Sequence, residues 1–231
     1  MTKFNSEEIY KILENELVTL QIKPNEILSE NALCARFDVS RTIVRSALQR
    51  LSQVGFVEII PHVGTRVTAI DLEEVNQYIY MRIAIEVKIL TDFIRTMTPP
   101  QIEKLRFCQK SLEDAVNEVH DFSQFDISMA DELLSKDLSF HKTYFQFMGK
   151  DILWDIISQP KPGYSRFIHL DIIGGKNLPD VLREHSELMN AIESSSLDSI
   201  EDILTRHLYG GIRRLGSKIY SDKLSLYIKS S

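Results

Sequence analysis

The stretch VSRTIVRSALQRL, residues 39–51, decides how the first part of the chain folds. Its apolar positions recur at the spacing of one helix face: Val44, Ala47, Leu48 and Leu51. Ser40 is a good N-cap residue and Gly55 a typical helix stop, so we expect a helix over residues 40–54. Arg41 and Arg45 are four residues apart and share the outer face, which raises the question of what anion they meet.

The flanking segments place this helix in a known arrangement. Residues 6–21, capped by Ser6, and residues 29–37, capped by Ser29, predict two earlier helices. After Gly55 the apolar period becomes that of strands, at residues 56–60 and 65–70, around a turn. Helix, short helix, turn, longer helix and hairpin is the order of a winged helix-turn-helix, whose second paired helix enters the major groove of DNA.

In such a fold the first turns of the long helix meet base edges and phosphates. The residues expected there are Ser40, Arg41, Thr42 and Arg45. Arginine suits this place because its planar fork pairs with guanine or with phosphate. The hairpin tip would be the wing, where Gly64 permits close approach and His62 and Arg66 touch the sugar–phosphate chain. The alternatives are a solvated helix face and a winged helix that binds protein.

The charge distribution agrees with an anionic partner at this end of the chain. The 231 residues include 27 Lys+Arg against 33 Asp+Glu, a net charge of -6, yet residues 36–66 hold five arginines against Asp38 and Glu58. We see no secretory signal and no stretch near the roughly 20 apolar residues that span a bilayer. Cys34 and Cys108 form no motif, so we expect buried thiols and a cytoplasmic protein.

From Asp71 onward every segment has the period of a helix. We expect helices at about 71–97, 100–119, 126–148, 151–173, 179–194 and 197–220, with the fourth kinked or broken at Pro160 and Pro162. The expected fold class is therefore mainly α. A winged helix-turn-helix domain over residues 1–70 precedes an all-α helical bundle over residues 71–231.

Four polar residues occupy core-facing positions of the expected bundle: Asp137, His141, His185 and His207. Asp137 and His141 are four residues apart on one helix, and the other two lie on later helices that can approach them. A buried carboxylate is costly unless it is paired. Three imidazoles and one carboxylate suit a divalent ion, with zinc, nickel, manganese and iron as candidates. The alternative is a metal-free, hydrogen-bonded core.

The segment LSENALCARFDVSRTIVRSALQRLSQVGFVEIIPHVGTRV, residues 28–67, resembles the DNA-binding domain of GntR-family transcription regulators. It departs from that pattern at Cys34, Ile43 and Ser46, none of which removes a DNA-contacting group. The resemblance implies contacts from the helix and wing, with Ser29 and Arg36 nearby. In the second domain, Asp-x-x-Phe-His, Glu-His and Arg-His-Leu are similar to the FCD subfamily, in which many members bind a metal through the matching four residues.

The FCD resemblance also implies a small carboxylate effector held against the metal. Arg82 and Glu86 fall on the apolar stripe of the first bundle helix, so Arg82 can reach that carboxylate while Glu86 orients it. The alternative for this pair is an internal salt bridge. Arg166 is another candidate for effector binding.

Together these features predict a DNA-binding transcription regulator and not an enzyme, with repression as the commonest behaviour of the family it resembles. Since one winged helix covers one half-site, we expect a homodimer on double-stranded operator DNA. The rivals are a metal-free regulator, a regulator whose effector is the metal ion, and a metal-dependent hydrolase. For the hydrolase we find no separate general base or nucleophile.

Overall fold

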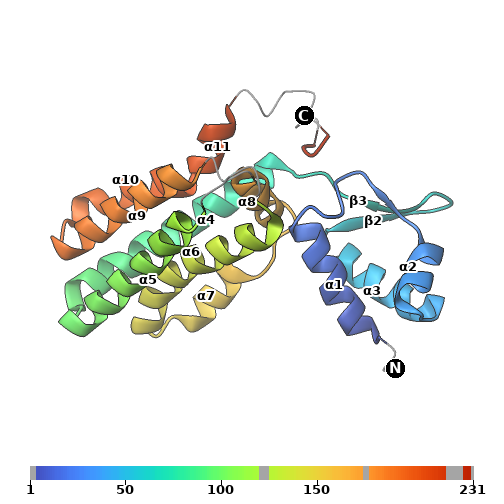
Figure 1. Cartoon of the computed structure of the whole chain (residues 1–231), viewed down its shortest axis with the longest axis horizontal. Helices are drawn as coiled ribbons and strands as arrows, with labels where there is room; N and C mark the ends of the chain where they lie inside the picture. Colours follow the sequence, from blue (N-terminus) through green and yellow to red (C-terminus); the bar gives the residue numbers. More distant parts are fainter. Residues whose placement is uncertain (1–3, 120–124, 174–176, 217–225, 230–231) are drawn as a thin grey trace. The chain divides into compact units, whose positions relative to one another are not determined.

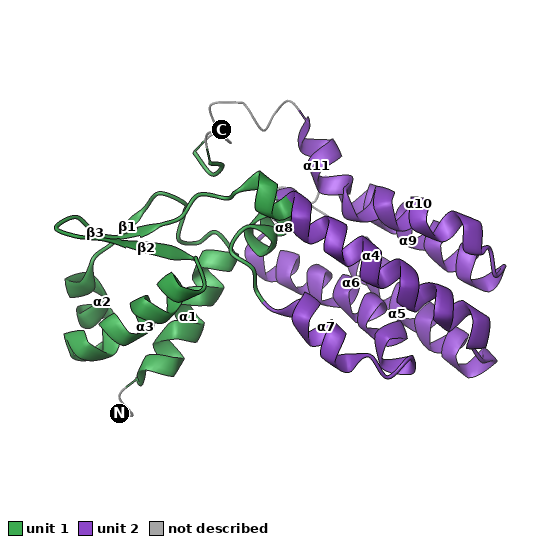
Figure 2. Cartoon of the chain, turned by 180° about the vertical axis from the view of Figure 1, so that it is seen from behind, with its two compact units in different colours: residues 1–75, 160–170, 217–231 green, residues 76–159, 171–216 purple. Residues whose placement is uncertain are grey.

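The computed structural model describes residues 4–119, 125–173, 177–216 and 226–229. They form two compact units, which Figure 2 colours green and purple. The first unit contains the chain up to Val75, residues 160–170 and the described tail at 226–229. The second contains residues 76–159 and 171–216, as far as they are described. The sequence assigns residues 160–170 and the tail to the helical bundle. The chain is therefore not divided between the two units at a single boundary at residue 70.

The first unit contains a winged helix-turn-helix (Figure 1). Its helices are α1 (Ser6–Val18), α2 (Glu30–Phe37) and α3 (Arg41–Gln53). Its sheet has the strand order β1 (Ile27–Leu28), β3 (Gly64–Val67), β2 (Val57–Ile60), with antiparallel neighbours. Thr65 in the central strand lies opposite Leu28 on one side and Ile59 on the other.

The apolar stripes of α1 and α3 meet in one core. Its fully buried side chains are Ile9, Leu13, Leu17, Val44, Ala47, Leu51, Phe56 and Val67. Burying one such large side chain contributes roughly 1.5–3 kcal/mol, so these positions fix how α3 is held. The cap of α1 is Asn5 and not Ser6, because the Asn5 side chain accepts from the Glu8 amide at 3.0 Å and Glu8 accepts from the Asn5 amide at 2.8 Å.

The chain that follows β3 is held by the described tail. Ile70 pairs with Ile228 in a parallel bridge: the Ile70 amide donates to the Tyr227 carbonyl at 2.8 Å, and the Lys229 amide donates to the Ile70 carbonyl at 2.9 Å. Both isoleucines are buried, and the Lys229 ammonium lies 2.8 Å from Asp71. The tail is therefore part of the first unit.

The second unit is a helical bundle. Its helices are α4 (Leu72–Thr96), α5 (Pro99–Asn117), α6 (Ile127–Phe147), α7 (Asp151–Ser158), α9 (Leu178–Glu193), α10 (Leu197–Leu208) and α11 (Gly210–Leu215). The first residues of α4 belong to the first unit. The main core is built by buried residues of α4, α5, α6, α7, α9 and α10, among them Leu90, Phe93, Leu105, Phe140, Trp154, Ile192 and Leu204. The mainly α fold class, with a winged helix-turn-helix and a bundle, is confirmed.

Two helix predictions meet different outcomes. The break at Pro160 and Pro162 is confirmed, because α7 ends at Ser158 and α8 (Tyr164–Ile172) begins after it. The helix expected over 197–220 is divided at Tyr209, and its end lies outside the described residues. Within the described part of the chain, no helix combines the length and the apolar character needed to cross a membrane.

Candidate functional site

The N-terminal end of α3 presents a polar surface. Its exposed residues are those that the sequence assigns to DNA contact: Ser40, Arg41, Thr42 and Arg45. They stay outside because the apolar stripe of α3 is committed to the core. Ser40 has the extended backbone of an N-cap, yet its hydroxyl makes no cap hydrogen bond. The hydroxyl and the first amides of a 13-residue helix are therefore suitably placed for an anion.

Both guanidinium groups at this end of α3 are held by α2. Arg41 donates to Asn31 Oδ1 at 2.7 Å, and Arg45 Nε lies 2.9 and 3.0 Å from the two oxygens of Glu30. The Arg45 side chain is 60% exposed, and ion pairs this exposed contribute little to stability because water screens them. A phosphate can thus replace these partners at little cost.

The third arginine of the stretch has another role. Arg50 pairs with Glu7 and places its guanidinium 4.2 Å from the ring centre of Tyr10 on α1. These contacts join α3 to α1. Arg50 therefore supports the packing of the winged helix and serves as a control for its DNA-facing arginines.

The two residues that the resemblance adds lie on or beside α2. Ser29 caps this helix, because its hydroxyl accepts from the Ala32 amide at 3.3 Å. Arg36 pairs with Glu16 of α1, with Nη1 2.8 Å from Oε2, and its side chain is 46% exposed. Both are on the surface, but each already has a structural partner.

The hairpin tip has the backbone that a wing requires. His62 and Gly64 are exposed and have positive φ angles of 64° and 129°. Glycine adopts such a φ at no steric cost, whereas a side chain at Gly64 would be strained. Arg66 lies in β3 with its guanidinium 3.4 Å from Glu58 of β2. The tip therefore offers one imidazole and one loosely paired guanidinium.

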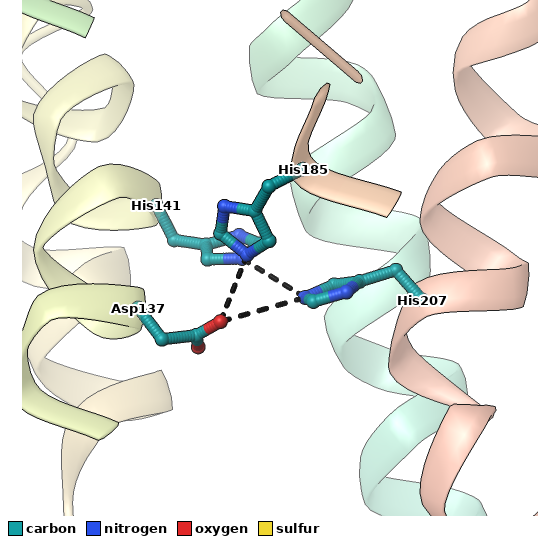
Figure 3. A group of neighbouring side chains, drawn as sticks. All are labelled: Asp137, His141, His185 and His207. Atoms are coloured by element: carbon teal, nitrogen blue, oxygen red, sulfur yellow. Dashed lines mark hydrogen bonds and ion pairs between the residues drawn. The ribbon is translucent and has the colours of Figure 1, made fainter. Parts of the chain in front are cut away.

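The second unit brings the four core-facing polar residues together. Figure 3 shows Asp137 and His141 from α6, His185 from α9 and His207 from α10 converging on one point. One candidate ligand atom from each residue lies within 4.8 Å of the others. His185 Nε2 is 2.8 Å from Asp137 Oδ1, and His141 Nε2 is 3.3 Å from His207 Nε2. Ligands of one zinc ion lie at most about 4.2 Å apart, so small side-chain shifts suffice to close the set.

Buried carboxylates contact the outward nitrogens of two of these imidazoles. His141 Nδ1 lies 2.7 Å from Glu86 Oε2, which also accepts a hydrogen bond from the Tyr144 hydroxyl at 2.5 Å. His207 Nδ1 lies 3.3 Å from Glu184 Oε2. Because a carboxylate only accepts hydrogen bonds, both Nδ1 atoms carry hydrogen, and in neutral rings of this tautomer the two Nε2 lone pairs face each other. A cation between them removes this repulsion, so the residues fit a metal ion.

The protonation states also suit a metal. Burial lowers the pKa of His185 to about 4, so its imidazole is neutral near pH 7. Burial by itself would raise the pKa of Asp137, but the hydrogen bond from His185 and the neighbouring imidazoles hold it below its usual range. The same opposition acts at Glu86, where Arg82 and His141 outweigh burial and lower the pKa. Neutral imidazoles and ionised carboxylates are the forms that coordinate metals.

The charged groups around the cluster favour binding of a divalent cation. Asp137, Glu86 and Glu184 supply three carboxylates, against the buried guanidinium of Arg82. Arg213, the next cation, lies 4.0 Å from Glu184, and its side chain is 51% exposed. The three carboxylates thus outnumber the buried guanidinium of Arg82, and a divalent ion would offset the excess of negative charge.

Arg82 and Glu86 form the internal salt bridge that the sequence leaves as the alternative. Their closest atoms, Arg82 Nη2 and Glu86 Oε1, are 2.7 Å apart, and both side chains are buried. The second oxygen of Glu86 faces His141, a link that the sequence does not reveal. An effector contact of Arg82 stays a prediction.

Arg166 has hydrogen-bond partners of its own. It belongs to the first unit, where its guanidinium donates to the carbonyl oxygens of Pro162, Thr68 and Ala69. The sequence offers Arg166 as a candidate but does not reveal which neighbours it meets. All three of its nitrogens have partners within the first unit. An effector contact of Arg166 stays a prediction.

Two residues of the site are absent from the sequence prediction. Tyr144 follows His141 by one helical turn, so the spacing could have placed it beside the cluster. Glu184 directly precedes His185, and neighbours in a helix point in different directions. Its contact with His207 depends on how α9 and α10 pack, which no local pattern encodes.

A winged helix-turn-helix with an exposed arginine face, joined to a helical bundle with a buried ligand set, defines a class of DNA-binding transcription regulators. Family comparison agrees: the model of bacterial regulatory proteins of the gntR family matches residues 5–67, and that of the FCD domain matches residues 77–210. The chain belongs to the GntR family of transcription regulators, with an FCD domain as its second part, and is not an enzyme.

Individual relatives agree with this assignment. The HTH-type transcriptional repressor RspR of Escherichia coli K12 is 26% identical over 203 residues, 88% of this chain and 85% of RspR. The gluconate operon transcriptional repressor of Bacillus subtilis 168 is 23% identical over 160 residues, 69% of this chain and 62% of that protein. The structure of E. coli McbR/YncC has the same fold, with a TM-score of 0.66 at 18% identity over 92% of this chain and 97% of that one.

Proposed function

We propose that this protein is a repressor that binds operator DNA as a homodimer and responds to a small carboxylate held at a divalent metal ion. The observation that carries the proposal is the convergence of Asp137, His141, His185 and His207 within 4.8 Å. DNA contact is assigned to the exposed N-terminal end of α3 and to the wing. Two relatives whose names include the word repressor support repression.

Zinc is the first candidate for the metal because histidine nitrogen and aspartate oxygen are among its usual ligands in proteins. Nickel, manganese and iron are the alternatives, since imidazole and carboxylate also suit them. The four side chains would hold the ion, and the ion would supply a positive anchor for the carboxylate of the effector.

Arg82 is the residue best suited to assist this anchoring. It pairs with Oε1 of Glu86, whereas Oε2 of that residue is already held by His141 and Tyr144. Arg82 can therefore turn toward an effector carboxylate while Glu86 keeps two donors. We therefore propose that Arg82 helps the metal ion to bind the effector carboxylate.

A second candidate function is sensing of the metal ion itself. The observation in its favour is burial: His141 is 0% and His185 1% exposed. A closed ligand set can respond to the ion without a further ligand. In that case, metal alone would change the affinity for operator DNA.

A homodimer follows from the need for two half-sites and from the character of α7. This helix buries Trp154 and Ile157, yet Ile152 and Ile156 on its other side are 78% and 46% exposed. Two large apolar side chains exposed on successive turns of one helix form an apolar patch of the kind that marks a protein-interaction surface. We therefore propose that a second copy of the chain covers this face.

The test is the melting temperature of the wild type and of His185→Ala against a panel of small carboxylic acids, before and after chelation. We expect zinc to stabilise the wild type alone, by about 2.7 kcal/mol when free zinc is 100 times the Kd. We also expect one acid to add a shift that chelation abolishes. A full complement of zinc in His185→Ala would remove that residue from the site. Unchanged melting of the wild type in zinc would contradict the metal site.

A further inference from the structure

The three imidazoles of the cluster differ in what contacts their outward nitrogens. His141 Nδ1 meets Glu86 and His207 Nδ1 meets Glu184, at 2.7 and 3.3 Å. His185 Nδ1 is buried and has no hydrogen-bond partner among the described residues. This difference is informative because the group on Nδ1 decides which ring nitrogen keeps its lone pair.

Glu86 is a rigid acceptor for His141. Its side chain is completely buried, and three hydrogen-bond contacts hold its two oxygens: Arg82 Nε at Oε1, and His141 Nδ1 and the Tyr144 hydroxyl at Oε2. Arg82 Nη2 adds an ion-pair contact to Oε1 at 2.7 Å. A carboxylate held in this way cannot rotate to release His141 without breaking several charge-assisted hydrogen bonds. It therefore fixes both the tautomer and the ring orientation of His141.

Glu184 holds His207 from the opposite direction, on α9. It is 5% exposed, and its second oxygen lies 4.0 Å from the Arg213 guanidinium. The 3.3 Å contact to His207 is longer than that of Glu86 to His141. Glu184 is thus the looser of the two, and its removal should cost less.

We propose that Glu86 and Glu184 are positioning residues, which hold His141 and His207 as Nδ1–H tautomers and aim their Nε2 lone pairs at the centre of the cluster. The inference rests on the proposed metal site. It adds a reason why the site would bind a cation, because the lone pairs of both imidazoles point to its centre. In the metal-free protein His185 takes the opposite tautomer, because its Nε2–H donates to Asp137. Metal binding then requires a proton to move only on His185, from Nε2 to Nδ1.

The first test reads the tautomers directly, by nitrogen NMR of protein labelled in its histidines, after chelation. We expect the Nδ1–H pattern for His141 and His207 and the Nε2–H pattern for His185, each assigned by a single substitution. Zinc should change the tautomer of His185 alone. Nε2–H signals from His141 and His207 in the metal-free protein would overturn the proposal.

The second test measures zinc affinity by competition with a chelating dye. Glu86→Gln and Glu184→Gln keep the shape but offer His141 and His207 an amide that can donate as well as accept, so the tautomer is no longer imposed. Loss of such a partner typically costs 10–100-fold in metal affinity, and we expect the larger loss for Glu86→Gln. Nitrogen NMR of the same two variants should show a mixture of tautomers, for His141 in Glu86→Gln and for His207 in Glu184→Gln.

A matched control separates positioning from general stability. Asp171 is also a buried carboxylate of the second unit, paired with Arg214 at 2.6 Å and bonded to Asn177, without a contact to the cluster. Asp171→Asn should bind zinc like the wild type. If Glu86→Gln fails to fold because Arg82 loses its partner, the double variant Arg82→Met/Glu86→Gln removes both charges together. Wild-type zinc affinity in the folded Glu86 and Glu184 variants would overturn the inference and leave the metal site standing, whereas absence of zinc binding in the wild type would remove the site itself.

Discussion

Arg166 and Thr68 are 98 residues apart in the sequence, yet Nη1 of Arg166 donates to the Thr68 carbonyl oxygen at 2.5 Å. Nη2 reaches the Thr68 hydroxyl at 3.1 Å and the Ala69 carbonyl at 3.3 Å. Burial lowers the pKa of Arg166 to about 10, so the guanidinium still carries its charge near pH 7. One buried cation thus fastens the segment that directly follows the wing.

We predict that Arg166→Met lowers the free energy of unfolding of the first unit by about 2 kcal/mol, because hydrogen bonds from a charged donor contribute about 1.5–3 kcal/mol and their buried acceptors would lose them. Thermal and urea unfolding measure the loss. The matched control is Arg183→Met, since Arg183 is 58% exposed and pairs with Asp180 and Glu187 at the surface. Equal stability of the two variants would contradict this role.

The case of Arg166 illustrates what the sequence can predict here. Helical spacing and caps predict the helices of both units, and the prolines predict the end of α7, because these signals act within a few residues. The two-residue strand β1 has no such signal: Ile27 and Leu28 become a strand only because β3 lies beside them. Arg166 has no local signal for its role either, because its partners Thr68 and Ala69 are distant in the chain.

The sequence likewise predicts the four candidate metal ligands but not the carboxylate of Glu184 that contacts one of them. Asp137, His141, His185 and His207 stand out because each interrupts an apolar stripe. Glu184 lies beside His185 in the sequence but contacts His207, so only the packing of α9 against α10 brings it to the site. The helical periodicity of a sequence shows which polar residues face a core. The packing of the helices then decides which of these residues come into contact.

Substitution of the exposed arginines should separate DNA contact from packing. We predict that Arg41→Ala and Arg45→Ala each weaken operator binding by about 1–3 kcal/mol, since each removes a group that can pair with a base or a phosphate. Arg50→Ala is the control, because Arg50 faces Glu7 and Tyr10. Gel shifts at one fixed salt concentration compare the three. Wild-type affinity in Arg41→Ala and Arg45→Ala would place the DNA contacts elsewhere.

Acid should destabilise the metal-free protein through His185. Burial lowers the pKa of His185 from 6.5 to about 4 in the folded state, so between these pH values the unfolded chain binds a proton that the folded one does not. Stability is therefore complete above about pH 6.5 and falls as the pH drops toward 4, by roughly 3 kcal/mol at most. The lowered pKa of Asp137 extends the loss in the same direction at lower pH. Urea unfolding at several pH values measures how the free energy of unfolding changes with pH. This change between pH 6.5 and 4 should be smaller in His185→Gln than in the wild type. An equal change in both proteins would exclude His185 as its source.

The outer face of α7 should control assembly. Ile152 and Ile156 are one helical turn apart, so they form a single apolar surface, and we propose that the α7 of a second copy covers it. A glutamate there would have to be buried in the dimer without a partner, which is far costlier than its exposure in the monomer. We therefore predict that Ile152→Glu/Ile156→Glu elutes as a folded monomer in size-exclusion chromatography with light scattering, and that it binds a palindromic operator much more weakly than the wild type. Phe107→Glu is the control, because Phe107 on α5 is 64% exposed and lies outside this surface. A dimer that survives the α7 substitutions but is broken by Phe107→Glu would assign the interface to α5.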